Sequence, residues 1–151
     1  MGEADVEALA ERVARLEAAE AARELTAAYA LALDTKDLDA LAALFTEDAV
    51  LHAGPRTLRG REAVVGFFRD ALLADPGTKK HLIMNHRVTH PAPGEVRVES
   101  YFMYTSTGPE SVLGWGGYSD LVRVAGGSAR FAEKRIVVDV AADVRTGWAG
   151  R

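Results

Sequence analysis

The first 34 residues carry apolar side chains at the spacing of a helix. In the first half of this segment they lie three or four positions apart, at Val6, Leu9, Val13 and Leu16. The following turns continue the stripe with Leu25, Ala28, Tyr29, Ala32 and Leu33. Such spacing places the apolar side chains on one helix face. We therefore predict a helix as far as Asp34 and, because of its length, a bend near Glu17-Ala18.

Two shorter helices and one short strand are predicted between residues 37 and 77. Asp37 suits the N-cap of a second helix, whose buried face carries Leu38, Leu41, Ala42 and Phe45. Residues 48–53 are typical of a short strand that ends at Gly54-Pro55. Gly60 precedes a third helix, whose apolar face carries Val64, Phe67, Phe68, Ala71 and Leu72. Asp75-Pro76-Gly77 ends that helix.

From Lys79 onward the pattern is that of β-structure. Breaks at residues 91–94, Gly108-Pro109 and Gly126-Gly127 separate four strand-like runs. One run alternates with a period of two, so that the following side chains share a face: Val96, Val98, Ser100, Phe102 and Tyr104. Helices followed by hairpins indicate a single α+β domain rather than a parallel βαβ fold.

Composition narrows the class of protein. The chain has 151 residues, 48% of them hydrophobic and 26% charged, which suits one globular domain with a substantial core. The net charge of −4 and the scattered basic residues give no reason to expect a nucleic-acid partner. Without cysteine there is no disulfide and no thiolate site. No apolar run approaches the roughly 18 residues of a membrane span, and the acidic start is unlike a signal peptide. We expect a cytoplasmic protein.

Asp34 and His81 are the best candidates for chemistry. Asp34 ends the long helix, and His81 lies near the start of an apolar strand. A carboxylate that orients an imidazole gives a general base that works near neutral pH. A negative charge at a helix C-terminus costs about 0.3–1 kcal/mol, which a histidine partner would offset. The alternatives are that Asp34 caps the following helix and that His81, after Lys79 and Lys80, is a surface residue.

Further side chains are candidates for lining a pocket. Asn85 has the same strand parity as His81, although it is equally suited to satisfying backbone groups. The face of Ser100, Phe102 and Tyr104 would line the cavity, with Trp115, between two glycines, as an aromatic wall; packing is the alternative role for each of these. Aromatic walls favour a flat, cyclic ligand. The histidines lack the spacing of metal ligands, so we expect no metal and no cofactor. Asp120, Glu133 and Arg135 are expected to form ion pairs outside the pocket.

The order of these elements resembles the cone-shaped, nuclear-transport-factor-2-like fold. Four segments resemble its SnoaL-like branch: residues 24–41, 45–49, 60–63 and 81–86. The resemblance implies N-terminal helices packed on a curved antiparallel sheet that encloses a pocket. Residues 17–142 would form the core of a single domain over residues 1–151, and residues 1–16 a helical extension.

The branch includes scytalone dehydratase, a bile-acid 7α-dehydratase and a hexachlorocyclohexane dehydrochlorinase. The resemblance implies that Asp34 and His81 form the base that removes a carbon-bound proton. The bile-acid enzyme also implies a catalytic tyrosine at Tyr29. Tyr29 lies about 140° round the helix from Asp34, and a core tyrosine is the alternative. Scytalone dehydratase has a second histidine on the next strand, where this chain has Ser100, which argues against the same reaction.

We therefore expect a cofactor-independent lyase or isomerase of the dehydratase or cyclase type. Its substrate would be a small cyclic molecule, polyketide-like or steroid-like. One alternative is a non-catalytic module of the same fold that binds a small molecule or takes part in an assembly. A third interpretation is the small subunit of a ring-hydroxylating oxygenase, which would require a large iron-bearing partner. The resemblance also implies a homodimer or homotrimer, formed through the outer face of the sheet. The stripe from Val6 to Leu16 would cover the mouth of the cone or pack on a second subunit.

Overall fold

The computed structural model describes residues 2–108 and 110–147. The helices are α1 (Glu3–Thr35), α2 (Leu38–Ala43) and α3 (Arg61–Ala74). The strands are β1 (Phe45–Ala53), β2 (Arg56–Arg59), β3 (Thr78–Ala92), β4 (Glu95–Thr107), β5 (Ser111–Ala125) and β6 (Ser128–Asp143). No helix in the described ranges has the length and apolar character needed to cross a membrane.

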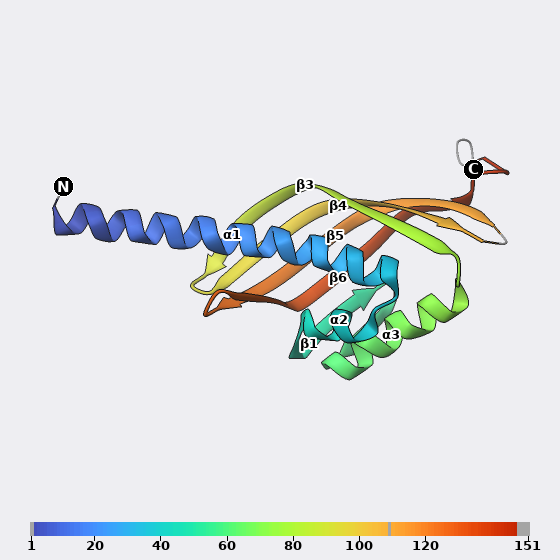
Figure 1. Cartoon of the computed structure of the whole chain (residues 1–151), viewed down its shortest axis with the longest axis horizontal. Coiled ribbons are helices and arrows are strands. Elements are labelled where there is room, and N and C mark those ends of the chain that lie inside the picture. The colour runs from blue at the N-terminus through green and yellow to red at the C-terminus, as the bar shows by residue number, and fades with distance from the viewer. Residues whose placement is uncertain (1, 109, 148–151) are drawn as a thin grey trace.

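One curved, open sheet of six strands forms the body of the molecule (Figure 1). The strand order is β2-β1-β6-β5-β4-β3, and neighbours are antiparallel except β1 and β6, which run parallel. Helix α1 lies across the sheet, and α3 packs near β1. The predicted α+β class and the hairpin sheet are confirmed, with a parallel pair where an antiparallel sheet was expected.

The segment after α2 differs most from the prediction. Phe45 begins β1 instead of ending the second helix, because tertiary contacts hold it in the sheet. The centroid of its ring lies 5.3 Å from that of Phe131. The backbone N–H of Phe131 also donates to the carbonyl of Leu44, at 2.8 Å. Strand β2, which was not predicted, pairs back on β1 beyond Gly54-Pro55. Of the predicted turn at Gly108-Pro109, Pro109 lies outside the described residues.

The long helix is continuous where a bend was expected. Its buried residues begin only at Ala19 and include Leu25, Tyr29 and Leu33. At 100° per residue these face about 170° away from the stripe of Val6 and Leu9. The two apolar sets therefore lie on opposite sides of one helix, which corrects the expectation of a single stripe. The first turns of α1 extend beyond the sheet (Figure 1).

A buried ion pair lies in the core between β5 and β6. Asp120 and Lys134 face each other in register, are fully buried, and lie 3.0–3.1 Å apart, measured from Nζ to each carboxylate oxygen. The ammonium lies 3.8 Å from the ring centroid of Tyr118 and 4.1 Å from that of Tyr29. Burial raises the pKa of Asp120 to about 6 and lowers that of Lys134. Asp120 forms an ion pair and does not line the cavity, as expected, but its partner is the buried Lys134 of the core.

We predict that breaking this pair destabilises the fold strongly. Lys134→Met should lower the free energy of unfolding by about 3–5 kcal/mol, because Asp120 is left buried without a partner. The double variant Asp120→Val/Lys134→Met should recover most of that loss, since a well-packed apolar pair needs no desolvation of charge. Urea unfolding monitored by circular dichroism measures both. Arg135→Met, on the exposed side of the same strand, is the control and should change stability by less than about 0.5 kcal/mol.

Candidate active site

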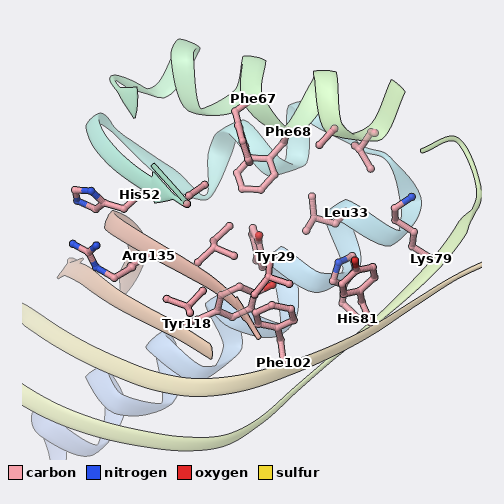
Figure 2. A pocket seen from close by; sticks show the side chains of 18 of the residues that line it. Tyr29, Leu33, His52, Phe67, Phe68, Lys79, His81, Phe102, Tyr118 and Arg135 are labelled. Carbon is pink, nitrogen blue, oxygen red and sulfur yellow. The ribbon is translucent and has the colours of Figure 1, made fainter. Parts of the chain in front are cut away.

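A cavity of about 630 Å³ lies between α3 and the inner face of the sheet. Its walls are apolar and aromatic, with Phe67 and Phe68 on the α3 side and Phe102 and Tyr118 opposite (Figure 2). His81 and Lys79 lie at one end, and His52 and Arg135 at the other. This volume is within the range of cavities that hold small organic ligands.

Asp34 and His81 meet at the end of α1, as the sequence predicts. The imidazole Nδ1 lies 2.7 Å from Oδ1 of Asp34, and the backbone N–H of His81 donates to both carboxylate oxygens at 3.1 Å. The Asp34 side chain is only 8% exposed and that of His81 11% exposed. A carboxylate against Nδ1 holds the proton on that nitrogen and leaves Nε2 as the basic one. His81 lines the cavity, whereas Asp34 reaches it only through His81.

The N-cap of α2 is Asp37 and not Asp34. The side chain of Asp37 accepts a hydrogen bond from the backbone N–H of Ala40 at 2.9 Å. Helix α1 has already closed at Lys36, which has a left-handed backbone with φ 58°. The carboxylate of Asp34, in the last turn, is therefore not needed as a cap and is turned toward β3.

A row of near-parallel rings leads away from His81. Tyr104 is its partner in register on β4, and the two ring centroids are 5.7 Å apart at an angle of 22°. Phe102 follows at 6.3 Å from Tyr104, and Tyr118 at 4.4 Å from Phe102. All four line the cavity. The residue of the next strand that faces His81 is thus Tyr104 and not Ser100.

Two glycines of β5 make room for these rings. A Cβ atom on Gly114 would collide with the ring of Tyr104, and one on Gly116 would collide with the Val137 carbonyl and meet the ring of Phe102 at 2.9 Å. Each ring leans over the glycine that is its register partner. The sequence Gly114-Trp115-Gly116 therefore shapes the cavity through the glycines, and Trp115, on the opposite side of the strand, is not among the lining residues.

Tyr29 lines the same cavity and is almost completely buried. Its ring meets those of Phe68, Tyr118 and Phe131 edge to face, at 5.7–5.8 Å. Burial, together with its interaction with the Tyr118 hydroxyl, raises the pKa of Tyr29 well above its usual value. Its phenol therefore stays protonated at neutral pH and can donate a hydrogen bond.

Two predicted pocket residues lie elsewhere. A β-bulge between Met84 and Arg87 breaks the strand parity, and Asn85 takes a left-handed backbone with φ 58° and is exposed. Asn85 therefore faces a groove on the other side of the sheet. His86 points inward instead, with Nε2 2.8 Å from the Thr26 hydroxyl of α1. Ser100 is buried but outside the cavity lining, and its hydroxyl has no hydrogen-bond partner among the described residues.

Lys79 is a cavity residue that the sequence analysis did not select. Its ammonium lies 2.6 Å from the Asp75 carboxylate and donates to the Asp75 carbonyl at 2.6 Å and, at 3.4 Å, to the hydroxyl of Ser106. The hydrogen bond from Lys79 lowers the pKa of Asp75. This network fixes the corner between α3 and β3 beside His81. Lys79 could have been found from the sequence, because it lies two residues before His81 on the same strand and its side chain therefore points to the same face.

The described residues contain no group of three or more histidine, aspartate or glutamate side chains placed to hold a metal ion.

Comparisons with known proteins agree with this architecture. The model of the SnoaL-like domain matches residues 14–147. A candidate scytalone dehydratase of Novosphingobium aromaticivorans is 21% identical, with a TM-score of 0.78 over 85% of this chain and 89% of its own. The hexachlorocyclohexane dehydrochlorinase LinA-type3 of Novosphingobium barchaimii is 18% identical, with a TM-score of 0.74 over 97% and 96% of the two chains.

A third similar structure is the β subunit of a candidate aromatic-ring-hydroxylating dioxygenase of Novosphingobium aromaticivorans. It is 22% identical, with a TM-score of 0.72 over 85% of this chain and 92% of its own. At these identities the structures establish the shared fold. No curated protein sequence matches the chain.

We predict that the glycine opposite Tyr104 is required for the shape of the cavity. Gly114→Ala should displace the Tyr104 ring from His81 and lower the free energy of unfolding by about 1–3 kcal/mol, the cost of overpacking. Gly117→Ala is the matched control on the same strand, because its Cβ would meet only the Ser100 carbonyl at an ordinary 3.7 Å. Thermal unfolding and a crystal structure of each variant measure the effect. Equal stability of the two variants would contradict this role of Gly114.

Proposed function

Because the chain belongs to the SnoaL-like domain family, we propose that it is a cofactor-independent lyase or isomerase acting on a small cyclic molecule. The proposal rests on the hydrogen bond between the carboxylate of Asp34 and Nδ1 of His81, at the wall of an aromatic cavity. The protein is further proposed to work in the cytoplasm as a homodimer or homotrimer.

The base is His81. Its Nε2 takes a proton from a carbon atom of the bound molecule. The electrons of the C–H bond then form a C=C bond, either as the π electrons of an adjacent carbonyl move onto its oxygen to give an enolate, or as the bond from the neighbouring carbon to a hydroxyl group breaks and that group leaves, protonated, as water. Asp34 keeps the proton on Nδ1 and stabilises the imidazolium that results. General-base catalysis of this kind contributes roughly 10²–10⁴-fold in rate. Loss of water, ring closure and double-bond migration all begin with this step.

Hydroxyl groups supply the acid side of the reaction. Tyr104 stacks on His81, and burial raises its pKa, so it carries its proton at neutral pH. Tyr29 carries its proton for the same reason. A substrate oxygen beside His81 accepts a hydrogen bond from one of these phenols as it gains negative charge. Preorganised donors of this kind are effective because they need no reorganisation during the reaction.

The lining indicates the class of substrate. Phe102 and Tyr118 present near-parallel rings 4.4 Å apart, and Phe67 and Phe68 lie opposite. Apolar walls with polar groups at the two ends suit a flat cyclic ketone or alcohol, polyketide-like or steroid-like. Two of the similar structures are, by name, a dehydratase and a dehydrochlorinase, which supports an elimination.

We predict that removal of the Asp34 charge abolishes proton abstraction. A panel of enolisable cyclic ketones incubated with the protein in D2O should lose carbon-bound hydrogen signals in the NMR spectrum. Asp34→Asn should slow this exchange by about 10²–10⁴-fold. Without the carboxylate, nothing holds the proton of His81 on Nδ1 or stabilises the imidazolium that forms. Asp37→Asn is the matched control: asparagine retains the cap of α2, and exchange should be unchanged.

Ligand binding measured by thermal shift distinguishes an enzyme from a module that only binds its ligand. Asp34→Asn should leave the affinity nearly intact if the dyad serves the reaction. Ligands that bind to wild type without any exchange would instead identify a binding module with no chemistry of its own.

We also predict a catalytic contribution from the Tyr104 hydroxyl. Tyr104→Phe keeps the ring that stacks on His81 and removes only the donor, so the exchange rate should fall by roughly 10²-fold. Tyr101→Phe, on the outer face of the same strand, is the control, because Tyr101 is 62% exposed. An unchanged rate in Tyr104→Phe would assign the donor role to Tyr29, to be tested as Tyr29→Phe.

A further inference from the structure

The first turns of α1 carry an apolar stripe that no other part of the described chain covers. Val6, Leu9, Val13 and Leu16 are 49%, 47%, 44% and 70% exposed. No other described element lies beside this part of the helix, which projects beyond the sheet (Figure 1). Four large apolar side chains in a row are more than the scattered single ones that a surface normally carries.

The stripe is turned away from its own domain. The residues of α1 that pack on the sheet, such as Leu25 and Leu33, point about 170° away from it around the helix. Because α1 is one continuous helix, the stripe cannot reach the sheet of its own chain. It does not cover the cavity either, since α1 lines the cavity only through Tyr29 and Leu33. Within the described residues nothing is placed to cover the stripe, so a second molecule is the candidate to do so.

The spacing of the stripe matches a two-stranded coiled coil. Val6 and Val13 occupy the first apolar position of two successive heptads, and Leu9 and Leu16 the second. A β-branched residue in the first position with leucine in the second favours a parallel pair of helices. The seam stops after two heptads, because the next two positions hold Glu20 and Arg23, which lie 3.5 Å apart in an ion pair of their own.

The charges beside the stripe select the orientation. In a parallel pair, Arg12 on one helix flanks the seam opposite Glu17 of the other, and the twofold axis repeats this attraction. In an antiparallel pair with Val6 opposite Leu16, the two Arg12 side chains would lie on the same flank near the twofold axis and repel each other. The parallel arrangement is therefore favoured.

We propose that residues 6–16 pair with the same segment of a second copy of this chain as a short parallel coiled coil. The two sheets then lie on the outer sides of the helix pair, because each stripe faces away from its own domain. Both cavities remain open. The pairing is independent of the reaction proposed above. Of the two assemblies proposed there it fits the homodimer, with the first turns of α1 rather than the outer face of the sheet as the contact. Two heptads make a small contact, so the assembly should dissociate on dilution.

The first test measures mass by sedimentation equilibrium over a range of concentrations. At high concentration the wild-type assembly should have twice the mass of Val13→Glu. The apparent dissociation constant of the dimer should be at least about tenfold higher for Val13→Glu than for wild type, equivalent to about 1.4 kcal/mol. Ala14→Glu adds the same charge one residue away, off the stripe, and should behave as wild type. Circular dichroism checks that the helix content is retained. Equal masses for wild type and Val13→Glu would overturn the proposal.

A second test determines the orientation, using the absence of cysteine from the chain. In a parallel pair each Leu9 faces its own counterpart, so Leu9→Cys should form a disulfide-linked dimer when oxidised with diamide. Glu11→Cys, on the opposite side of the helix, is the control and should not. A disulfide that forms only between Leu9→Cys and Val13→Cys chains would show an antiparallel pair and overturn the parallel one.

Discussion

The carboxylate of Asp34 joins the end of α1 to the start of β3. It accepts the backbone N–H of His81 and lies against the imidazole Nδ1, so that one side chain fixes both the strand and the ring it carries. A carboxylate in the last turn of a helix is disfavoured by the helix dipole, and here these hydrogen bonds offset that cost. The last turn of the long helix is thus joined to β3 by the same contact that orients the imidazole.

The rest of the cavity is built outward from this contact by aromatic packing. Tyr104 stacks on His81, Phe102 and Tyr118 follow, and Gly114 and Gly116 leave the space that the rings occupy. Below them the buried ammonium of Lys134 lies against the rings of Tyr29 and Tyr118 and is neutralised by Asp120. The cavity therefore combines an apolar wall, phenol hydroxyls and an imidazole oriented by Asp34, the combination on which the proposed proton abstraction depends.

The same helix serves two purposes at its two ends. From Ala19 onward it packs on the sheet and delivers Tyr29 and Asp34 to the site. Before that it presents an apolar face to the outside, turned away from its own domain. A straight helix transmits orientation over its length, so pairing of the first turns in the proposed dimer would hold both domains without touching either cavity.

Local patterns determined much of this protein. Apolar spacing predicted α1 and α3, and turn residues predicted the hairpins, because these depend on neighbours within a few residues. Asp34 and His81 lie 47 positions apart, and their pairing was predicted from their chemistry together with the resemblance to the SnoaL-like branch. Only the tertiary structure decided that Phe45 enters the sheet, that a bulge turns Asn85 outward, that Tyr104 faces His81 and that Asp120 pairs with Lys134. Strand register and sheet curvature arise from contacts between distant segments, which a periodic pattern does not encode.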